Sequence, residues 1–217
     1  MSQPKAAKFY SFAEERVNIG SHFFGLLMSV LASFFLLLHA VRSEELLHFV
    51  SFAVFGISLI SLYSASILYH SAKEPETRRK LRIVDHAAIY ILIAGTYTPF
   101  TLITLSGPIG WSLFAISWAM ATAGVVLKIF FTGRYSLVST LMYVFMGWLI
   151  VFAIGPLIDN LSAEGLFWLV SGGVSYTVGA VLYAIKKIPF NHAIFHVFVV
   201  LGSFCHIVAV YFYVLPA

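Results

Sequence analysis

Long apolar stretches alternate with short polar segments along the whole chain. Each stretch is about as long as the roughly 20 apolar residues that a helix needs to cross a bilayer. We expect seven membrane-spanning helices, at residues 20–41, 48–69, 83–104, 109–129, 137–156, 165–185 and 192–213. The pattern predicts an all-α integral membrane protein with one seven-helix domain over residues 1–217, including a short polar segment at 1–19. Short connections, the longest at 71–82, favour antiparallel packing of consecutive helices.

Composition agrees with the pattern. The chain is 60% hydrophobic and 10% charged, whereas soluble domains carry about 25% charged residues. A water-soluble enzyme and a nucleic-acid-binding module are therefore excluded, and we expect membrane lipids as the surrounding partners. The sequence does not predict an oligomeric state.

The basic residues predict the orientation. If the N-terminus lies in the cytoplasm, the segments on that side hold twelve of the thirteen lysines and arginines, and only Arg42 falls outside. Basic residues accumulate in the cytoplasmic loops of membrane proteins. We therefore expect a cytoplasmic N-terminus, an external C-terminus, and a multi-pass protein of the cell inner (plasma) membrane.

Two helices carry residues suited to close packing. In the stretch 165–185, Gly172, Ser175, Tyr176 and Gly179 follow the spacing of one helix face. Small residues on such a face let a neighbouring backbone approach closely. Pro99 interrupts the third stretch, where we expect a kink.

Histidines gather at one end of the predicted bundle. His192 and His196 stand four residues apart, which places both imidazoles on one helix face. At the same, cytoplasmic end lie His22, His70 and His86, each at the end of its span. His206 comes 14 residues after His192, about 21 Å further along a helix, so it cannot share a metal with His192. His39 and His48 lie toward the other face, where we expect interfacial roles.

The residues at this end suit a zinc site. Catalytic zinc takes three protein ligands and one water, and imidazole favours zinc over magnesium or calcium. We expect His70, His192 and His196 as ligands, with Asp85 holding the zinc-bound water and accepting its proton. Ser66 shares a helix face with His70 and belongs to the surroundings of the site. An alternative leaves Asp85 paired with Arg82, one turn earlier.

These motifs together resemble the haemolysin III family, the bacterial branch of the progestin and adipoQ receptor superfamily. The resemblance covers nearly the whole chain. It rests on Glu15-x-x-Asn18-x-x-Ser21-His22, Ser66-x-x-x-His70, Asp85 and His192-x-x-x-His196. It implies seven helices, a cytoplasmic N-terminus and zinc near the cytoplasmic face, with ligands His70, His192 and His196 and with Asp85 on the zinc-bound water. His22 matches the motif, and we expect it to pack against the ends of the second and seventh spans.

Three functions remain open at this point. The first is a zinc-dependent hydrolase of a lipid amide or ester, in which Asp85 is the general base. The second is a pore-forming, cytolytic haemolysin, as the family name suggests. The third is a sensor or receptor in which zinc is structural.

Overall fold

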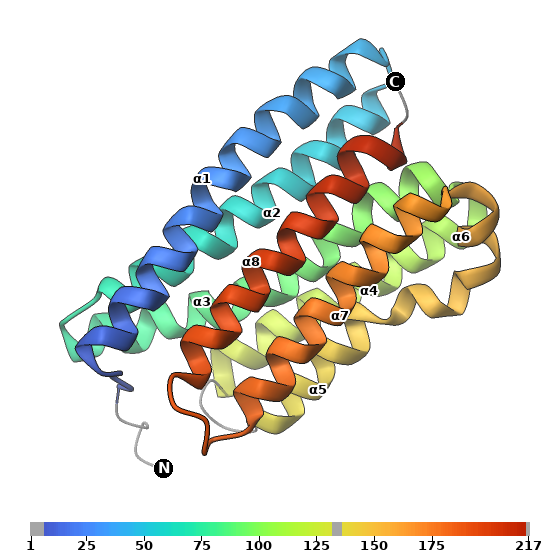
Figure 1. Cartoon of the computed structure of the whole chain (residues 1–217). Coiled ribbons are helices and arrows are strands. Elements are labelled where there is room, and N and C mark those ends of the chain that lie inside the picture. Colours follow the sequence, from blue (N-terminus) through green and yellow to red (C-terminus); the bar gives the residue numbers. More distant parts are fainter. Residues whose placement is uncertain (1–6, 132–135, 216–217) are drawn as a thin grey trace.

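The computed structural model describes residues 7–131 and 136–215, except for the side chain of Ser136. Every regular element within these residues is helical. The longer helices run along one axis in a single bundle (Figure 1). In chain order the elements are α1 Phe12–Arg42, α2 Leu46–Ser71, α3 Pro75–Pro99, η1 Phe100–Leu105, α4 Gly107–Phe131, α5 Ser136–Gly147, η2 Leu149–Ala153, α6 Ile154–Asn160, α7 Ala163–Ala184, α8 Asn191–Ala209 and η3 Val210–Val214.

The all-α class and the seven spans are confirmed. Seven helical segments of the described chain are long and apolar enough to cross a membrane. Their exposed faces carry large apolar side chains such as Phe24, Leu31 and Phe35, whereas Ser29 and Ser33 of the same helix are buried. This polarity, with apolar groups outside and polar groups inside, suits a lipid environment.

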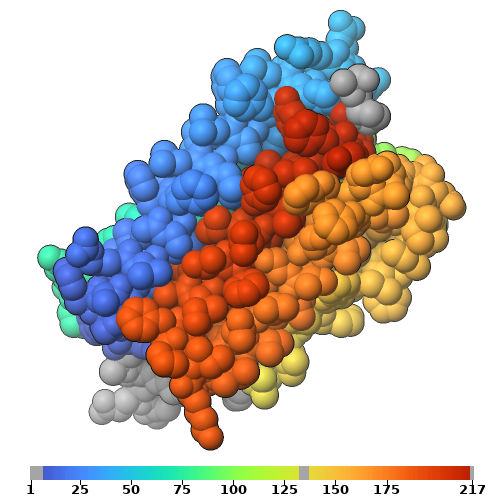
Figure 2. Space-filling model, in the orientation of Figure 1, coloured from blue at the N-terminus to red at the C-terminus, as the bar shows by residue number. Residues whose placement is uncertain are grey.

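Helix α3 occupies the centre of the bundle. In its most apolar stretch 78% of the residues are buried, whereas the corresponding share in the other spans is 17–50%. Helices α1 and α8 lie side by side on one face, seen in blue and red in Figure 2. Helix α1 begins and η3 ends at opposite ends of the bundle (Figure 1), as an odd number of spans requires.

Two helices begin well before their apolar stretches, whereas the others begin within two residues of them. Helix α1 starts at Phe12, where Ser11 Oγ accepts a hydrogen bond from the Glu14 N–H at 3.2 Å. Helix α3 starts at Pro75 and is capped by the Glu74 carboxylate. Most of the connection predicted at 71–82 is therefore helical. Hydropathy marks where lipid-compatible residues begin, whereas capping residues decide where the helix begins.

The fifth span is not the continuous helix that its apolar run predicts. The chain passes from α5 through η2 to α6, with Trp148 at the break. The Tyr97 hydroxyl donates to the Gly147 carbonyl at 3.1 Å and accepts from the Ile150 N–H at 2.8 Å. Tyr97 on α3 thereby satisfies backbone groups that the break leaves open, as the membrane interior requires. At Pro99, where we expected a kink, the α-helix passes into the π-helical segment η1.

The close packing predicted for α7 is confirmed. Gly172 lies against the His206 ring, and Ser175 Oγ donates to the Phe198 carbonyl at 3.1 Å. A Cβ built on Gly179 would stand 2.7 Å from Phe198 Cβ, an atom fixed by the backbone of α8. The small residues therefore bring α7 and α8 into direct contact.

Substituting Gly179 tests this contact. We expect Gly179→Ala to lower the free energy of unfolding by about 1–3 kcal/mol, because the added methyl group overpacks the interface. Gly173→Ala is the matched control, since its nearest neighbour atom would be 3.6 Å away. Thermal unfolding of both purified variants gives the comparison. Equal stability of the two would contradict the packing described here.

Candidate metal centre

The three predicted ligands come together at one end of the bundle. His70 lies in the last turn of α2, and His192 and His196 lie in the first two turns of α8. All three are buried, and one ligand atom of each lies within 4.8 Å of the others. The Nε2 atoms of His70 and His192 are 3.2 Å apart. The helix spacing seen in the sequence thus produces a cluster that can hold one metal ion.

A carboxylate orients His70. His70 Nδ1–H donates to Glu15 Oε2 at 2.6 Å, which leaves Nε2 facing the cluster. Likewise, His196 Nδ1 lies 3.4 Å from the Asn18 carbonyl oxygen. Metal-binding histidines commonly donate their second nitrogen to a carboxylate or a carbonyl, which fixes the tautomer and the ring. Helix α1 therefore supplies the supporting contacts for ligands on α2 and α8.

Arg78 holds the Glu15 carboxylate in place. It is 1% exposed and forms an ion pair with Glu15 Oε1. Its guanidinium also donates to the carbonyls of Tyr69, His70 and Ala72, at 3.1–3.2 Å. These carbonyls end α2, where the helix cannot satisfy them itself. Arg78 thus connects the end of α2 to the histidine cluster.

Glu15→Gln is expected to weaken metal binding by about 10–100-fold, because His70 loses its charged hydrogen-bond partner. Zinc titration of metal-stripped protein measures the change. Glu14→Gln, one residue earlier in the same helix turn, is the control and is expected to bind zinc like the wild type. Unchanged affinity in Glu15→Gln would show that Glu15 does not act on the metal site.

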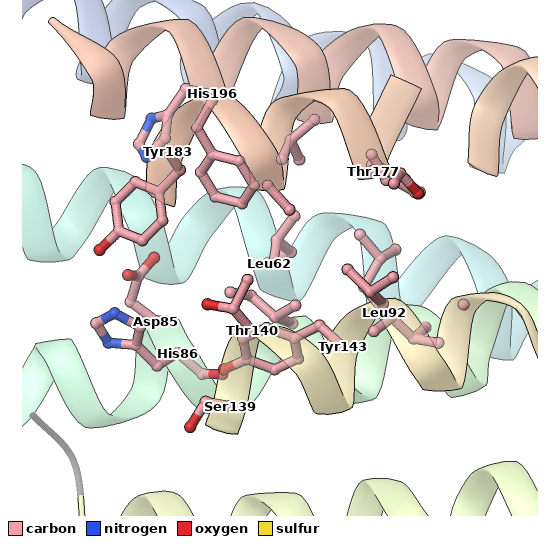
Figure 3. A pocket seen from close by; sticks show the side chains of 18 of the residues that line it. Leu62, Asp85, His86, Leu92, Ser139, Thr140, Tyr143, Thr177, Tyr183 and His196 are labelled. Atoms are coloured by element: carbon pink, nitrogen blue, oxygen red, sulfur yellow. The ribbon is translucent and has the colours of Figure 1, made fainter. Parts of the chain in front are cut away.

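Asp85 faces the histidines from α3. It is 8% exposed, lines a cavity beside His192 and His196, and points toward His196 and Tyr183 on the opposite helices (Figure 3). Among the described residues no ion pair within 4.0 Å joins it to Arg82, so the alternative pairing is not seen. Ser66 is buried nearby, but its hydroxyl makes no hydrogen bond of ordinary geometry to the described residues. A carboxylate in this position can hold a water molecule and accept its proton.

His22 takes the packing position expected for it. Its ring stacks on His196 with the centroids 3.7 Å apart, and it meets Tyr63 of α2 edge-on at 5.0 Å. Neither ring nitrogen has a hydrogen-bond partner among the described residues. His22 therefore supports the His196 ring from the side of α1.

The segment before α1 covers the cluster. Tyr10 stacks on His192 with the ring centroids 4.6 Å apart, and its backbone N–H donates to Glu15 Oε1 at 3.1 Å. The Lys8 carbonyl accepts a hydrogen bond from Arg78 Nε at 2.7 Å. Burial raises the pKa of Tyr10, so its phenol stays neutral and adds no charge beside the histidines. This segment was expected only as a polar N-terminal stretch.

A cavity of about 360 Å³ opens from the cluster into the bundle. Figure 3 shows part of its lining, in which Leu62 and Leu92 give an apolar character beyond Asp85. The lining extends as far as His206, which packs over Gly172 and against Tyr176. His206 is therefore a buried lining residue far from the cluster, as its position in the sequence predicts. His86 also lines the cavity, and its Nδ1 pairs with the Arg82 carbonyl.

The other two histidines contact the opposite end of the bundle. His39 Nε2 donates to the Leu215 carbonyl at 2.6 Å, and His48 Nδ1 pairs with Ser43 Oγ at 2.9 Å. Both lie at helix ends away from the cluster. The division of the histidines between the two ends is as predicted.

Known proteins are similar to this chain over nearly its full length. The family model described as Haemolysin-III related matches residues 10–207. The chain belongs to the haemolysin III family. It is 46% identical to Hemolysin-3 of Bacillus cereus, over 98% of this chain and 97% of the relative. It is 45% identical to a Hemolysin-3 homolog of Bacillus subtilis (strain 168), over 94% of this chain and 96% of the relative.

A more distant similarity reaches animals. The human monocyte to macrophage differentiation factor is 27% identical over 92% of this chain and 84% of its own length. The resemblance drawn from the motifs is thereby confirmed for haemolysin III. Both this family and the seven apolar helices indicate a multi-pass membrane protein.

Sequence reasoning missed the supporting residues of this haemolysin III site. Arg78 was counted only as a basic residue of the loop, and Glu15 only as part of a motif without a role. Tyr10 was not considered. The spacing Glu15-x-x-Asn18-x-x-x-His22 places three polar groups on one face of an apolar helix. A polar face on such a helix could have predicted a buried hydrogen-bond network.

Proposed function

We propose that this haemolysin III family member binds one zinc ion on His70, His192 and His196 and hydrolyses an amide or ester bond of a lipid. The observation that carries the proposal is the position of three buried imidazoles and the Asp85 carboxylate at one end of an apolar cavity. Such a cavity suits an acyl chain, and the polar end suits the bond to be cleaved.

The donor set fits zinc. In a tetrahedral site with Zn–N bonds of about 2.0–2.1 Å, two ligand nitrogens lie about 3.3–3.4 Å apart. The Nε2 atoms of His70 and His192 are 3.2 Å apart. Neutral imidazoles also suit copper, iron and nickel, so metal analysis identifies the ion. Three protein ligands leave a fourth position for water or substrate.

Each residue then has a defined task. When bound, zinc supplies an acidified water and polarises the lipid carbonyl. Asp85 takes a proton from the water while the water oxygen forms its bond to the carbonyl carbon. Asp85 then returns that proton to the leaving nitrogen or oxygen as the C–N or C–O bond breaks. Glu15 and Arg78 hold His70 in its orientation. Apolar residues of the cavity hold the acyl chain and exclude bulk water.

We also propose an orientation and a cellular membrane for this protein. With most basic residues at the end of the bundle that holds the histidines, the positive-inside rule places this end and the N-terminus in the cytoplasm and the C-terminus outside. In a bacterial cell the protein would then lie in the inner (plasma) membrane. The lipid substrate would approach from the cytoplasmic leaflet.

Turnover of lipids tests the function. Purified protein with full zinc occupancy is incubated with ceramides, other N-acyl lipids, phospholipids and acylglycerols, and released fatty acid is measured by mass spectrometry. We expect release from at least one class, and loss of release on chelation. No turnover across the panel would contradict a hydrolase. A collapse of thermal stability on chelation without turnover would favour the structural-zinc receptor, and conductance that vanishes in zinc-site variants would favour a pore.

A further inference from the structure

Basic side chains surround the entrance of the cavity. Lys8 lies before α1, Arg82 on α3, Lys128 on α4 and Lys186 between α7 and α8, and all four line the cavity. Among the described lining residues Asp85 is the only carboxylate. Without the histidines, these four basic residues and the one carboxylate give the cavity entrance an excess of three positive charges.

Lys128 is enclosed, and Arg82 is partly enclosed. Lys128 is 5% exposed, and its ammonium donates to Ser139 Oγ at 2.7 Å and lies 5.5 Å from the centre of the Tyr143 ring. The Nε atom of Arg82 is buried and has no hydrogen-bond partner among the described residues. Basic residues that only set the orientation of a membrane protein extend into water, so the burial of Lys128 points to a further role at the cavity.

The positive charges also lie close enough to repel one another. Burial lowers the pKa of Lys8, with Glu14 opposing the shift and Arg82 adding to it. Burial, and then the charge of Lys8, lower the pKa of Lys186. Holding like charges together costs free energy in a partly buried site, and a bound anion would recover it.

We propose that this entrance binds the phosphate group of a lipid, whose acyl chain occupies the apolar part of the cavity. A phosphate monoester carries a charge of about −1.5 to −2, which matches the excess of positive charge better than a single carboxylate. In a glycerol phosphate lipid the acyl ester stands a few bonds from the phosphate. Phosphate at Lys8 and Lys186 therefore brings the ester toward His192 and Asp85. This inference names the substrate class of the proposed hydrolase and depends on that function only for the bond cleavage.

Binding of a lipid that cannot be hydrolysed tests the inference apart from catalysis. The probe is 1-O-octadecyl glycerol 3-phosphate, an ether, added to the full-length protein in phosphatidylcholine nanodiscs. The comparison ligand is 1-O-octadecyl glycerol, which has the same chain and no phosphate. We expect the ether phosphate to bind at least about tenfold more tightly than the ether glycerol, because charged hydrogen bonds to the phosphate add to the same chain contacts.

Matched variants identify the residues. The double variant Lys8→Gln/Lys186→Gln is expected to lose most of this tenfold preference. Lys73→Gln/Lys187→Gln removes the same charge from the same end without touching the cavity, and it should retain the preference. Equal loss in both pairs would overturn the inference in favour of general surface charge. Displacement of the ether lipid by millimolar inorganic phosphate would overturn the lipid assignment in favour of a free-anion site.

The outcome is independent of turnover. If the ether lipid binds as expected while no lipid is cleaved, the hydrolase proposal fails and the phosphate site stands. If lipids without phosphate are cleaved and the ether phosphate binds no better than its glycerol analogue, the hydrolase stands and the phosphate site is wrong.

Discussion

Replacing His196 with alanine is expected to reduce bound zinc from about one ion per chain to almost none, with the helical bundle still folded. Two histidines then remain, fewer than the three protein ligands of a catalytic zinc site. The ring of His196 lies 4.5 Å from that of His192 and 4.9 Å from that of His70, in the place of the third ligand. Metal content of the detergent-purified protein, measured by elemental analysis, gives the result.

His48→Ala is the control for this prediction, because His48 pairs only with Ser43 in the described structure and lies at the opposite end. It should retain the full zinc content. His196→Gln, which keeps most of the ring volume against His22, serves if the alanine variant unfolds. Zinc retained by folded His196→Gln or His196→Ala would contradict the assignment of this ligand, and zinc missing from carefully purified wild type would contradict the site as a whole.

Replacing Asp85 with asparagine is expected to reduce lipid turnover by about 10²–10⁴-fold, the usual contribution of a general base. Zinc content should remain near that of the wild type, because the three imidazoles are unchanged. Asparagine has nearly the same shape but cannot accept the proton. Turnover and metal content measured on one preparation separate loss of chemistry from loss of metal.

Asp159→Asn is the matched control for Asp85→Asn. Asp159 is exposed at the end of α6 and takes no part in the cavity lining. Its turnover should equal that of the wild type. If Asp85→Asn turned over lipid at the wild-type rate, Asp85 would not be the base. If it lost zinc instead, Asp85 would belong to the ligand set, and the closed site would favour a structural role for the metal.

The membrane class and the histidine cluster follow from local sequence. In lipid, the backbone N–H and C=O groups of an apolar run of about 20 residues find their hydrogen bonds within a helix. The number of such runs therefore predicts seven spans. The fixed rise of a helix then assigns a depth to each histidine. His192 and His196 share a face by spacing alone, and depth brings His70 to the same end. Depth places His22 and His86 at that end as well, so the choice of these three histidines as ligands stays a prediction.

Helix boundaries and breaks depended on contacts between elements. The start of α3 at Pro75 follows from capping by Glu74, which hydropathy does not report. The break at Trp148 is stabilised by Tyr97 from a helix about 50 residues away in the chain. An apolar run has the same composition with or without such a break, because the residue that satisfies the open backbone groups lies elsewhere.

The sequence by itself determined the membrane class, the number of spans and the shared helix face of His192 and His196, because each depends on composition or on helical spacing within one segment. Only the tertiary structure decided which groups support those histidines. Glu15 lies 55 residues from His70, and Tyr10 stacks on His192 from the opposite end of the chain. Arg78 forms its ion pair with Glu15 across 63 residues. Contacts at such separations depend on how the helices pack against one another, and no periodicity within a single helix encodes them.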